Sequence, residues 1–367
     1  MKRGFGWFAA FATLVLGLVH PAVAETLRDS LDGLERRIDA GELPNLHSVV
    51  IFKDGEVIGE RYLTGPDERR GQPLGTVTFE RDTLHDIRSV TKSIVGLLFA
   101  IALDEGAVKS EDEPVIDYFS DYGGPRSPDL AKIQLRHILT MTSGLKWDER
   151  TFPYTDARNS ESLMDAAPDR VRYILSQPAA TAPGSAWRYS GGDTALAAQV
   201  IARATGMPIE DYAQAKLFAP LGIARFDWVK DRDGTAIAAS GLRLTPRDMA
   251  KIGQLMLDGG VYDGRRILSR NLADAVVGGT VSTQPSAAAT QPCTMHYGYF
   301  WWVMPACDGR GHPEWFAAMG NGGQRIVVVP SRRIVAVTTT GNYNDPKGDQ
   351  IADIVTLAVL NAGGGQK

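Results

Sequence analysis

The pattern of hydrophobic and polar positions divides the chain into a β-rich start, a helical middle and a β-rich end. A first amphipathic helix that ends near Gly41 is predicted by apolar residues three or four positions apart, namely Leu27, Leu31, Leu34 and Ile38. The apolar-rich runs 47–52 and 57–62 flank Asp54 and Gly55, a pair typical of a hairpin turn. Residues 64–83 carry several glycines, prolines and charges and are expected to form a loop.

From residue 85 to residue 290 the pattern is mostly helical. Residues 89–105 form a long apolar run that ends before Gly106, which predicts a buried helix. Further helices are predicted near 168–177, 192–205, 209–217 and 246–257, the last from the capping sequence that begins at Thr245. Residues 146–162 are expected to be an exposed loop between these helices.

Strands return at the end of the chain, over 297–303, 324–329 and 334–339, and an apolar stripe over 349–361 predicts a last helix. The economical arrangement is an α/β fold of the α+β kind. One antiparallel sheet is formed from both chain ends and is flanked by the terminal helices. We place this sheet lobe at about 25–84 and 291–367, and an inserted, mostly helical lobe at about 85–290.

Composition and charge narrow the choice of partners. The chain has 367 residues and a net charge of −4, and no run rich in lysine and arginine occurs, so no nucleic-acid partner is expected. Lys2 and Arg3 precede the apolar run 5–19, and the small residues 22–24 follow it. This pattern predicts a signal peptide over residues 1–24, cleaved after Ala24, and therefore a periplasmic or secreted protein with no membrane anchor after cleavage. An uncleaved anchor is the alternative, although the run is shorter than the ~20 residues that span a bilayer.

The predicted export gives meaning to the two cysteines of the chain, Cys293 and Cys307. An oxidising compartment permits them to form a disulfide. The segment between them reads as one strand over 297–303, whose ends would lie ~20 Å apart at ~3.3 Å per residue. One flank must therefore fold back before the two sulfurs can meet, and both outcomes stay open.

The first turn of the predicted helix 89–105 carries the strongest chemical signal. Ser89 and Lys92 are three residues apart and therefore lie on one face of a helix. A serine hydroxyl needs a base to become a nucleophile, and a lysine can be that base if burial lowers its pKa. The alternative interpretation is a serine that only caps the helix, with a lysine that reaches the solvent. The same spacing recurs at Ser143 and Lys146, but there Gly144 ends the helix.

Five segments together resemble the serine β-lactamase and penicillin-binding-protein superfamily, in its class C-like branch of esterases and 6-aminohexanoate-dimer-type amide hydrolases. They occur in the family's order and cover most of the mature chain: residues 89–92, 139–145, 183–190, 239–248 and 322–324. The resemblance implies the β-lactamase/transpeptidase-like fold, and an acyl-enzyme formed on Ser89 with the help of Lys92. It also implies that Tyr189 is the second catalytic element, although Gly191 stands where the family has asparagine.

The third element of the family, Lys-Thr-Gly or His-x-Gly on a strand, departs further here. The corresponding stretch contains Gly320, Asn321, Gly322 and Gly323 and offers neither lysine nor histidine. These four residues are expected to bind substrate, and a backbone N–H there would form an oxyanion hole with that of Ser89. The missing cation argues against β-lactams as the main substrates, and Arg325 could replace it only if it faced the cleft.

The remaining residues add no cofactor. The histidines of the mature chain show no metal-ligand spacing, so neither a metal nor another cofactor is predicted. We expect a small-molecule ester or amide as the substrate of an exported serine hydrolase. The alternatives are a β-lactamase or D-Ala-D-Ala carboxypeptidase, a catalytically weak binding module of the same fold, and an unrelated fold. Four tryptophans are candidate walls of an apolar acyl pocket: Trp147, Trp187, Trp301 and Trp302.

Overall fold

A computed structural model of the chain describes residues 26–122, 129–284, 293–308 and 311–361, so the predicted signal peptide lies outside the described residues. The helices of this part are α1 (Leu27–Asp39), α2 (Val90–Asp104), α3 (Leu135–Leu139), α4 (Ser160–Ala166), α5 (Arg170–Leu175), α6 (Gly191–Thr205), α7 (Ile209–Ala213), α8 (Pro246–Leu257), α9 (Arg270–Val276) and α10 (Pro346–Asn361). None of the described helices is long and apolar enough to span a membrane.

The strands form one large antiparallel sheet and three small ones. The members of the large sheet, in spatial order, are β10 (Val281–Ser282), β11 (His296–Gly298), β12 (Trp301–Pro305), β13 (Pro313–Gly320), β14 (Gln324–Val329), β15 (Ile334–Thr340), β1 (Leu46–Lys53) and β2 (Glu56–Tyr62). The small sheets pair β3 (Thr64–Arg69) with β4 (Gln72–Thr78), β8 (Val261–Tyr262) with β9 (Arg265–Arg266), and β7 (Leu242–Leu244) with β5 (His85–Asp86) and β6 (Asp227–Trp228). The pairing of β1 with β15 joins the two chain ends, as predicted.

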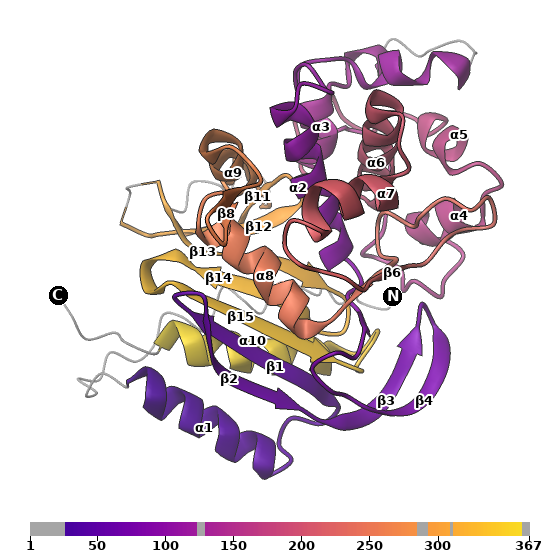
Figure 1. The fold of residues 1–367 in the computed structure, drawn as a ribbon. Helices are drawn as coiled ribbons and strands as arrows, with labels where there is room; N and C mark the ends of the chain where they lie inside the picture. Colours follow the sequence, from indigo (N-terminus) through magenta and orange to yellow (C-terminus); the bar gives the residue numbers. More distant parts are fainter. Residues whose placement is uncertain (1–25, 123–128, 285–292, 309–310, 362–367) are drawn as a thin grey trace.

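Two layers of helices cover the large sheet (Figure 1). Alternate residues of a strand point to opposite faces. Val49 and Ile51 pack with α1 and α10 on one face, and Val50 belongs to the larger core around α2 and α8 on the other. The α+β fold predicted from the sequence is thereby confirmed. The lobes interleave more than expected, because α8 covers the sheet and β10 joins it ahead of residue 291.

The polar segment after β2 is a hairpin rather than the expected loop. β3 and β4 pair from Thr64 with Thr78 to Arg69 with Gln72, with one register shift between Asp67 and Glu68. The turn residues Arg70 and Gly71 both have positive φ, of 52° and 82°, which suits the twist of a two-residue hairpin. Its residues are largely exposed, so the alternation of apolar and polar positions that marks a half-buried strand is absent. Figure 1 shows this hairpin projecting from the sheet toward the helical lobe.

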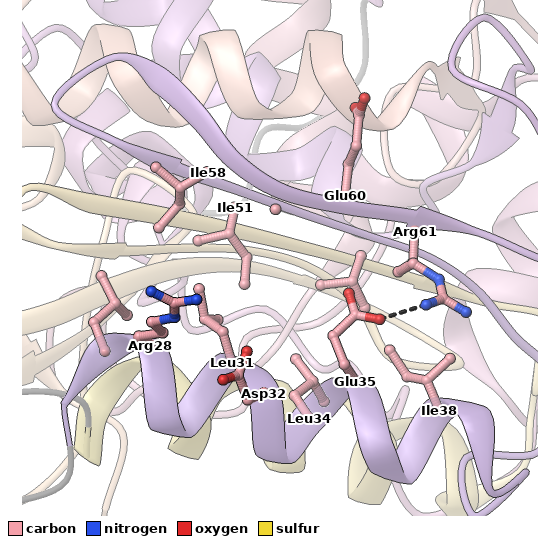
Figure 2. Close-up of a pocket in the computed structure, with 13 residues that line it drawn as sticks. Arg28, Leu31, Asp32, Leu34, Glu35, Ile38, Ile51, Ile58, Glu60 and Arg61 are labelled. Carbon is pink, nitrogen blue, oxygen red and sulfur yellow. Dashed lines mark hydrogen bonds and ion pairs between the residues drawn. The ribbon is translucent and has the colours of Figure 1, made fainter.

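A hollow of about 520 Å³ lies between α1 and the edge strand β2, on the face of the sheet that α1 and α10 cover (Figure 2). Arg61 of β2 crosses it to contact Glu35 and donates a hydrogen bond of 2.8 Å to Asp39. These ion pairs hold α1 against the end of the sheet. The hollow contains none of the residues predicted to act in chemistry.

The segment 297–303, which we expected to be one strand, is split into β11 and β12. Tyr299 and Phe300 form the turn between them, with φ values of 41° and 66°. Ser93 holds this turn against α2 by donating a 2.7 Å hydrogen bond to the Phe300 carbonyl. Because the chain folds back here, Cys293 and Cys307 come within 5.4 Å between Cα atoms and form a disulfide.

We expect the double replacement Cys293→Ser and Cys307→Ser to lower the free energy of unfolding by about 3 kcal/mol, since the cross-link closes a loop with a sequence separation of 14 residues. Denaturant unfolding of the oxidised protein and the double variant measures this difference. Hydrolytic activity at 25 °C should stay within about threefold, because neither cysteine lines the cleft described below. Equal stability of the two proteins would contradict the prediction.

Candidate active site

Ser89 and Lys92 form the floor of a cleft at the N-terminal end of α2. The Lys92 Nζ donates a hydrogen bond of 3.1 Å to the Ser89 Oγ. Ser89 occupies the N-cap position, but its side chain makes no capping hydrogen bond. The preceding residue, Arg88, has a φ of 50°, an uncommon conformation that turns the chain sharply into the helix. Ser89 therefore presents its hydroxyl to Lys92 instead of capping the helix.

Lys92 is fully buried and does not reach the solvent. Its ammonium group donates to the Ala239 carbonyl at 3.0 Å and to Glu161 Oε2 at 3.2 Å, and it lies 3.5 Å from Glu149 Oε1. Burial alone would lower the pKa of Lys92, as the sequence suggested. The negative charge carried by the carboxyl groups of Glu161 and Glu149 outweighs burial and raises the pKa of Lys92 above its usual value. The expectation of a lowered lysine pKa is therefore wrong.

Glu149 and Glu161 are buried functional candidates that the sequence analysis missed, because it treated residues 146–162 as an exposed loop. The two carboxyl groups hydrogen bond to each other. Burial and the neighbouring Glu161 raise the pKa of Glu149 to about 8. Burial also acts to raise the pKa of Glu161, but Lys92 outweighs it, and the net result is a pKa lowered to about 2. At neutral pH the pair therefore holds one proton and one negative charge beside the lysine cation.

One signal in the sequence points to Glu149. Leu145, Trp147 and Glu149 alternate with the more exposed Lys146 and Asp148, so the acid shares an inward face with two apolar residues. A buried lysine requires a counter-charge, and the segment with this alternation supplies it. Glu161 gives a weaker signal, since only the helix cap formed by Asn159 places it at the start of α4.

Tyr189 completes the group around Ser89. Its side chain hydrogen bonds with Ser89, and the Lys92 Nζ lies 5.1 Å from the centre of its ring. Burial raises the pKa of the Tyr189 phenol, and Lys92 opposes this only in part. Ser190 then caps α6, because its side chain accepts a hydrogen bond of 3.0 Å from the Asp193 amide.

Of the glycine-rich residues predicted to bind substrate, Gly320 and Asn321 border the cleft. A Cβ on Gly320 would lie 2.3 Å from the Ile87 carbonyl oxygen and 3.1 Å from the Ser89 amide nitrogen, so β13 runs directly against the start of α2. The Ser89 amide makes no hydrogen bond to another backbone group among the described residues. It is thus free to serve an oxyanion hole. Asn321 lines the cleft and receives a hydrogen bond of 2.7 Å from the Asn344 amide at its Oδ1.

Gly322 and Gly323 lie elsewhere. They form the turn from β13 to β14, with φ values of 86° and 83°, and pack against Tyr343 and Gly348. Neither lines the cleft, which corrects their expected place in the oxyanion hole. Arg325 follows on the face of β14 that meets α10, where it pairs with Asp353 at 2.5 Å and Asp349 at 3.5 Å. Arg325 also lines the cleft, and these two carboxylates compensate its charge there.

The cleft has two compartments that meet at Ser89. One, of about 290 Å³, has a wall of aromatic and apolar side chains, Phe152, Tyr154, Tyr189, Trp302 and Met319, and is also lined by the charged residues Glu149, Arg150, Arg325 and Asp349. The other, of about 890 Å³, lies under the β3–β4 hairpin and is lined mainly by polar and charged residues, among them Glu68, Arg69, Arg70, Arg88 and Asp165. Of the four candidate tryptophans, only Trp302 lines the aromatic compartment, and Trp147 instead donates a hydrogen bond of 2.8 Å to Glu149.

The second copy of the serine–lysine spacing builds no site. Ser143 is buried, whereas Lys146 is exposed on the other side of the chain. Gly144 has a φ of 78° and ends the helical geometry between them. Ser89 and Lys92 meet because α2 places them on one face, whereas Ser143 and Lys146 do not share a helix, as the sequence indicated.

A third cluster has the residue types of a metal site. Among the described residues, His47, Asp67 and His85 bring three such ligand atoms within 4.8 Å of one another, which the sequence spacing did not indicate. The imidazoles hydrogen bond directly at 2.8 Å, and Arg243 lies 3.5 Å from Asp67. Burial lowers the pKa of both histidines to about 3, so both are neutral. The hydrogen bond and the arginine account for the cluster without an ion.

The contact between β13 and α2 gives a testable prediction. Gly320→Ala places a Cβ against the Ile87 carbonyl and must push the strand away from Ser89. We expect kcat/KM to fall on the order of 10²-fold, because shifts of about 1 Å in a reacting group have effects of this size. Gly59→Ala in β2 is the control, since its Cβ meets nothing within 4 Å. Equal activity of both variants in a steady-state assay would contradict the placement of the oxyanion hole.

Comparison with known proteins identifies the family and the fold. The family model described as Beta-lactamase matches residues 34–360. The 6-aminohexanoate-dimer hydrolase of Paenarthrobacter ureafaciens is 25% identical over 294 residues, 74% of this chain and 69% of that protein. Esterase EstB of Burkholderia gladioli is 30% identical over 182 residues, 47% of this chain and 44% of the esterase. The penicillin-binding protein homologue of Pyrococcus abyssi shares the fold, with a TM-score of 0.64 and 19% identity over 91% of this chain and 77% of that one.

Proposed function

This chain belongs to the Beta-lactamase family and is a hydrolase of the serine β-lactamase type. We propose on this basis that it cleaves esters or amides through an acyl-enzyme formed on Ser89. The observation that carries the proposal is the 3.1 Å hydrogen bond from the buried Lys92 to a serine hydroxyl that caps no helix and opens on a cleft. A nucleophile, an adjacent proton acceptor and an oxyanion site are what acyl transfer requires.

The proposed reaction has two stages. The Ser89 Oγ attacks the substrate carbonyl carbon while its proton passes to the Lys92 and Tyr189 side of the cleft. The amide of Ser89 and a backbone N–H of β13 near Gly320 stabilise the oxyanion. The leaving alcohol or amine departs with a proton, and the acyl group remains on Ser89. A water molecule then attacks the ester, and the acid leaves as Ser89 regains its proton.

The two compartments support a substrate with a compact apolar acyl group. An aromatic space of about 290 Å³ beside Ser89 suits such a group, and the larger charged compartment suits a polar leaving group. β13 carries no lysine, arginine or histidine, and Arg325 pairs with α10. The arginines that line the cleft near Ser89, Arg88, Arg150 and Arg325, lie outside β13. This strand therefore offers no cation of its own to hold a carboxylate next to the scissile bond, which supports esters and amides over β-lactams and D-Ala-D-Ala peptides.

We further propose export. The pattern of residues 1–24 has the form of a signal peptide, and the disulfide between Cys293 and Cys307 suits an oxidising compartment. Secretion of a full-length fusion, followed by N-terminal sequencing of the mature protein, tests this proposal. A mature chain that begins at Glu25 is expected, whereas retention of Met1 would contradict it.

Substrate preference is tested with short-chain nitrophenyl esters, a nitroanilide amide and a chromogenic cephalosporin, assayed side by side. We expect ester hydrolysis to have the highest kcat/KM, with the cephalosporin turned over slowly or not at all. Rapid cephalosporin turnover without esterase activity would overturn the preference in favour of a β-lactamase. Absence of turnover on all three, in a folded protein, would favour the binding-module alternative.

A further inference from the structure

The carboxyl pair contacts Lys92 next to Ser89, with Glu149 lining the aromatic compartment and Glu161 the larger one. Glu161 Oε2 is 3.2 Å and Glu149 Oε1 3.5 Å from the Lys92 Nζ, which itself is 3.1 Å from the Ser89 Oγ. The structure thus contains an unbroken chain of hydrogen bonds and ion pairs from the serine hydroxyl through the lysine to two buried carboxyl groups. All three charged side chains are at most 3% exposed.

The absent side chain at Gly191 makes room for this pair. A Cβ on Gly191 would lie 2.4 Å from Glu161 Oε2 and 3.2 Å from Glu149 Oε2. The Gly191 amide also donates a 2.6 Å hydrogen bond to Glu149 Oε2. This is the position at which the sequence departs from the family's asparagine. The departure is therefore matched by two acids that occupy the space next to the lysine.

Neither of the groups that touch Ser89 is a free base at neutral pH. The buried carboxyl pair keeps Lys92 protonated, and burial keeps Tyr189 a neutral phenol. A general base works best when its pKa lies near the working pH. Within the cluster, Glu149, with a pKa raised by burial and by Glu161 to about 8, meets this condition.

We infer that Glu149 and Glu161 are positioning residues that together receive the Ser89 proton by way of Lys92. In the reactive form both carboxyl groups are ionised and Lys92 is an ammonium ion. As the Ser89 Oγ bonds to the carbonyl carbon, its proton moves to the Lys92 Nζ, and one Nζ proton moves to the pair. Lys92 remains an ammonium ion facing the new oxyanion, and the pair now holds one proton. That proton returns through Lys92 to the leaving group.

Other charged and titratable groups face the pair without replacing it. Arg70 Nη1 lies 4.0 Å from Glu161 Oε1, and Ser240 donates to the same oxygen at 2.9 Å. Tyr154 donates to Glu149 Oε1 at 3.1 Å. The remaining neighbours that influence the two carboxyl groups or Lys92 are Asp165, Arg150, Tyr189, Asp193 and Tyr297. Among the described residues, Glu149 and Glu161 are the carboxyl groups in ion-pair contact with Lys92.

This inference rests on the proposed function and predicts its pH dependence. Because the reactive form needs the pair fully ionised, kcat/KM should rise about tenfold per pH unit up to a plateau above about pH 8. Glu149→Gln and Glu161→Gln each leave one carboxyl group, which Lys92 keeps ionised throughout this range. In both variants kcat/KM should therefore not change with pH. It should be on the order of 10²-fold lower than that of the wild type at pH 9.5 and within about threefold of the wild-type value at pH 6.

The experiment measures kcat/KM for a nitrophenyl ester from pH 6 to 9.5, with background hydrolysis subtracted, for the wild type and both variants. Glu105→Gln is the matched control, since Glu105 is also paired with a lysine, Lys216 at 2.6 Å, but at the surface.

Thermal unfolding at the same pH values gives a second readout. The raised pKa of Glu149 stabilises the fold at low pH, and that contribution is lost as pH rises through about 8. The Tm of Glu149→Gln, relative to the Tm of the wild type, should therefore increase as pH rises.

The outcomes separate the two proposals. The inference is supported if kcat/KM of the wild type rises up to about pH 8, and if this rise is lost in Glu149→Gln and Glu161→Gln but kept in Glu105→Gln. An active enzyme in which the rise persists in either glutamine variant overturns the inference and leaves the proposed function standing. A wild type without turnover contradicts the proposed function. In that case, a Tm difference between Glu149→Gln and the wild type that does not change with pH would also overturn the inference that the two carboxyl groups share a proton.

Discussion

Replacement of Ser89 by alanine is expected to lower kcat/KM for ester hydrolysis by at least about 10⁴-fold, because removal of the serine from a working triad costs about 10⁶-fold. Without the Oγ no acyl-enzyme forms, and the oxyanion hole can only assist direct attack by water. The fold should not change, because the Ser89 side chain caps no helix. Steady-state kinetics and the Tm of the variant together measure the effect.

Ser143→Ala provides the matched control, because Ser143 has the same sequence relation to Lys146 without the geometry of a site. Its activity should stay within about threefold of the wild type. If Ser89→Ala retained a tenth or more of the activity while folded, Ser89 would not be the nucleophile. If Ser143→Ala were the inactive variant, the reaction would belong to the other copy of the motif.

Lys92→Met is expected to lower kcat/KM by about 10³-fold or more and to destabilise the fold. Removal of one partner of a buried ion pair costs about 3–5 kcal/mol, because the remaining charge is buried without compensation. Here Glu161 and Glu149 would lose their cation, so their pKa values would rise and both would take up protons. Groups with raised folded-state pKa values stabilise a protein at low pH and lose that contribution as pH rises. The deficit of Lys92→Met should therefore grow from pH 5 to pH 8.

Denaturant unfolding at the two pH values, combined with kcat/KM, measures both effects. Lys146→Met is the control for loss of a lysine, and as an exposed residue it should change the stability by less than about 0.5 kcal/mol. A Lys92→Met variant as stable as the wild type at pH 8 would show that the carboxyl pair does not depend on the lysine.

The sheet and the contact between Ser89 and Lys92 could be predicted because local patterns determine them. The β-rich runs of β1, β14 and β15, which are buried on both faces, and the long apolar run of α2 leave few arrangements that bury them. The spacing of Ser89 and Lys92 has meaning only on such a helix. The polar β3–β4 hairpin escaped prediction because its stability comes from turn geometry and from contacts such as Arg69 with Asp227, 158 residues apart in sequence.

The carboxyl pair was missed for a different reason. Glu149 and Glu161 lie in a segment whose composition is that of a solvated loop, and their burial depends on tertiary contacts with Lys92 and Gly191. The error about the pKa of Lys92 has the same origin, because burial was considered without the partners that burial requires. The fold-back at Tyr299 and Phe300 was likewise hidden, since the turn residues are apolar and give no glycine or asparagine signal.

The central claim, that Ser89 is an activated nucleophile, is tested most directly by a fluorophosphonate ester, which forms an O–P bond with an activated serine as fluoride leaves. The protein is incubated with the probe, digested and mapped by mass spectrometry, with Ser89→Ala and Ser143→Ala treated alongside. The account predicts a single stoichiometric adduct on Ser89 in the wild type and in Ser143→Ala, and none in Ser89→Ala. A folded wild type that gains no adduct, or gains it on another serine, would contradict the account.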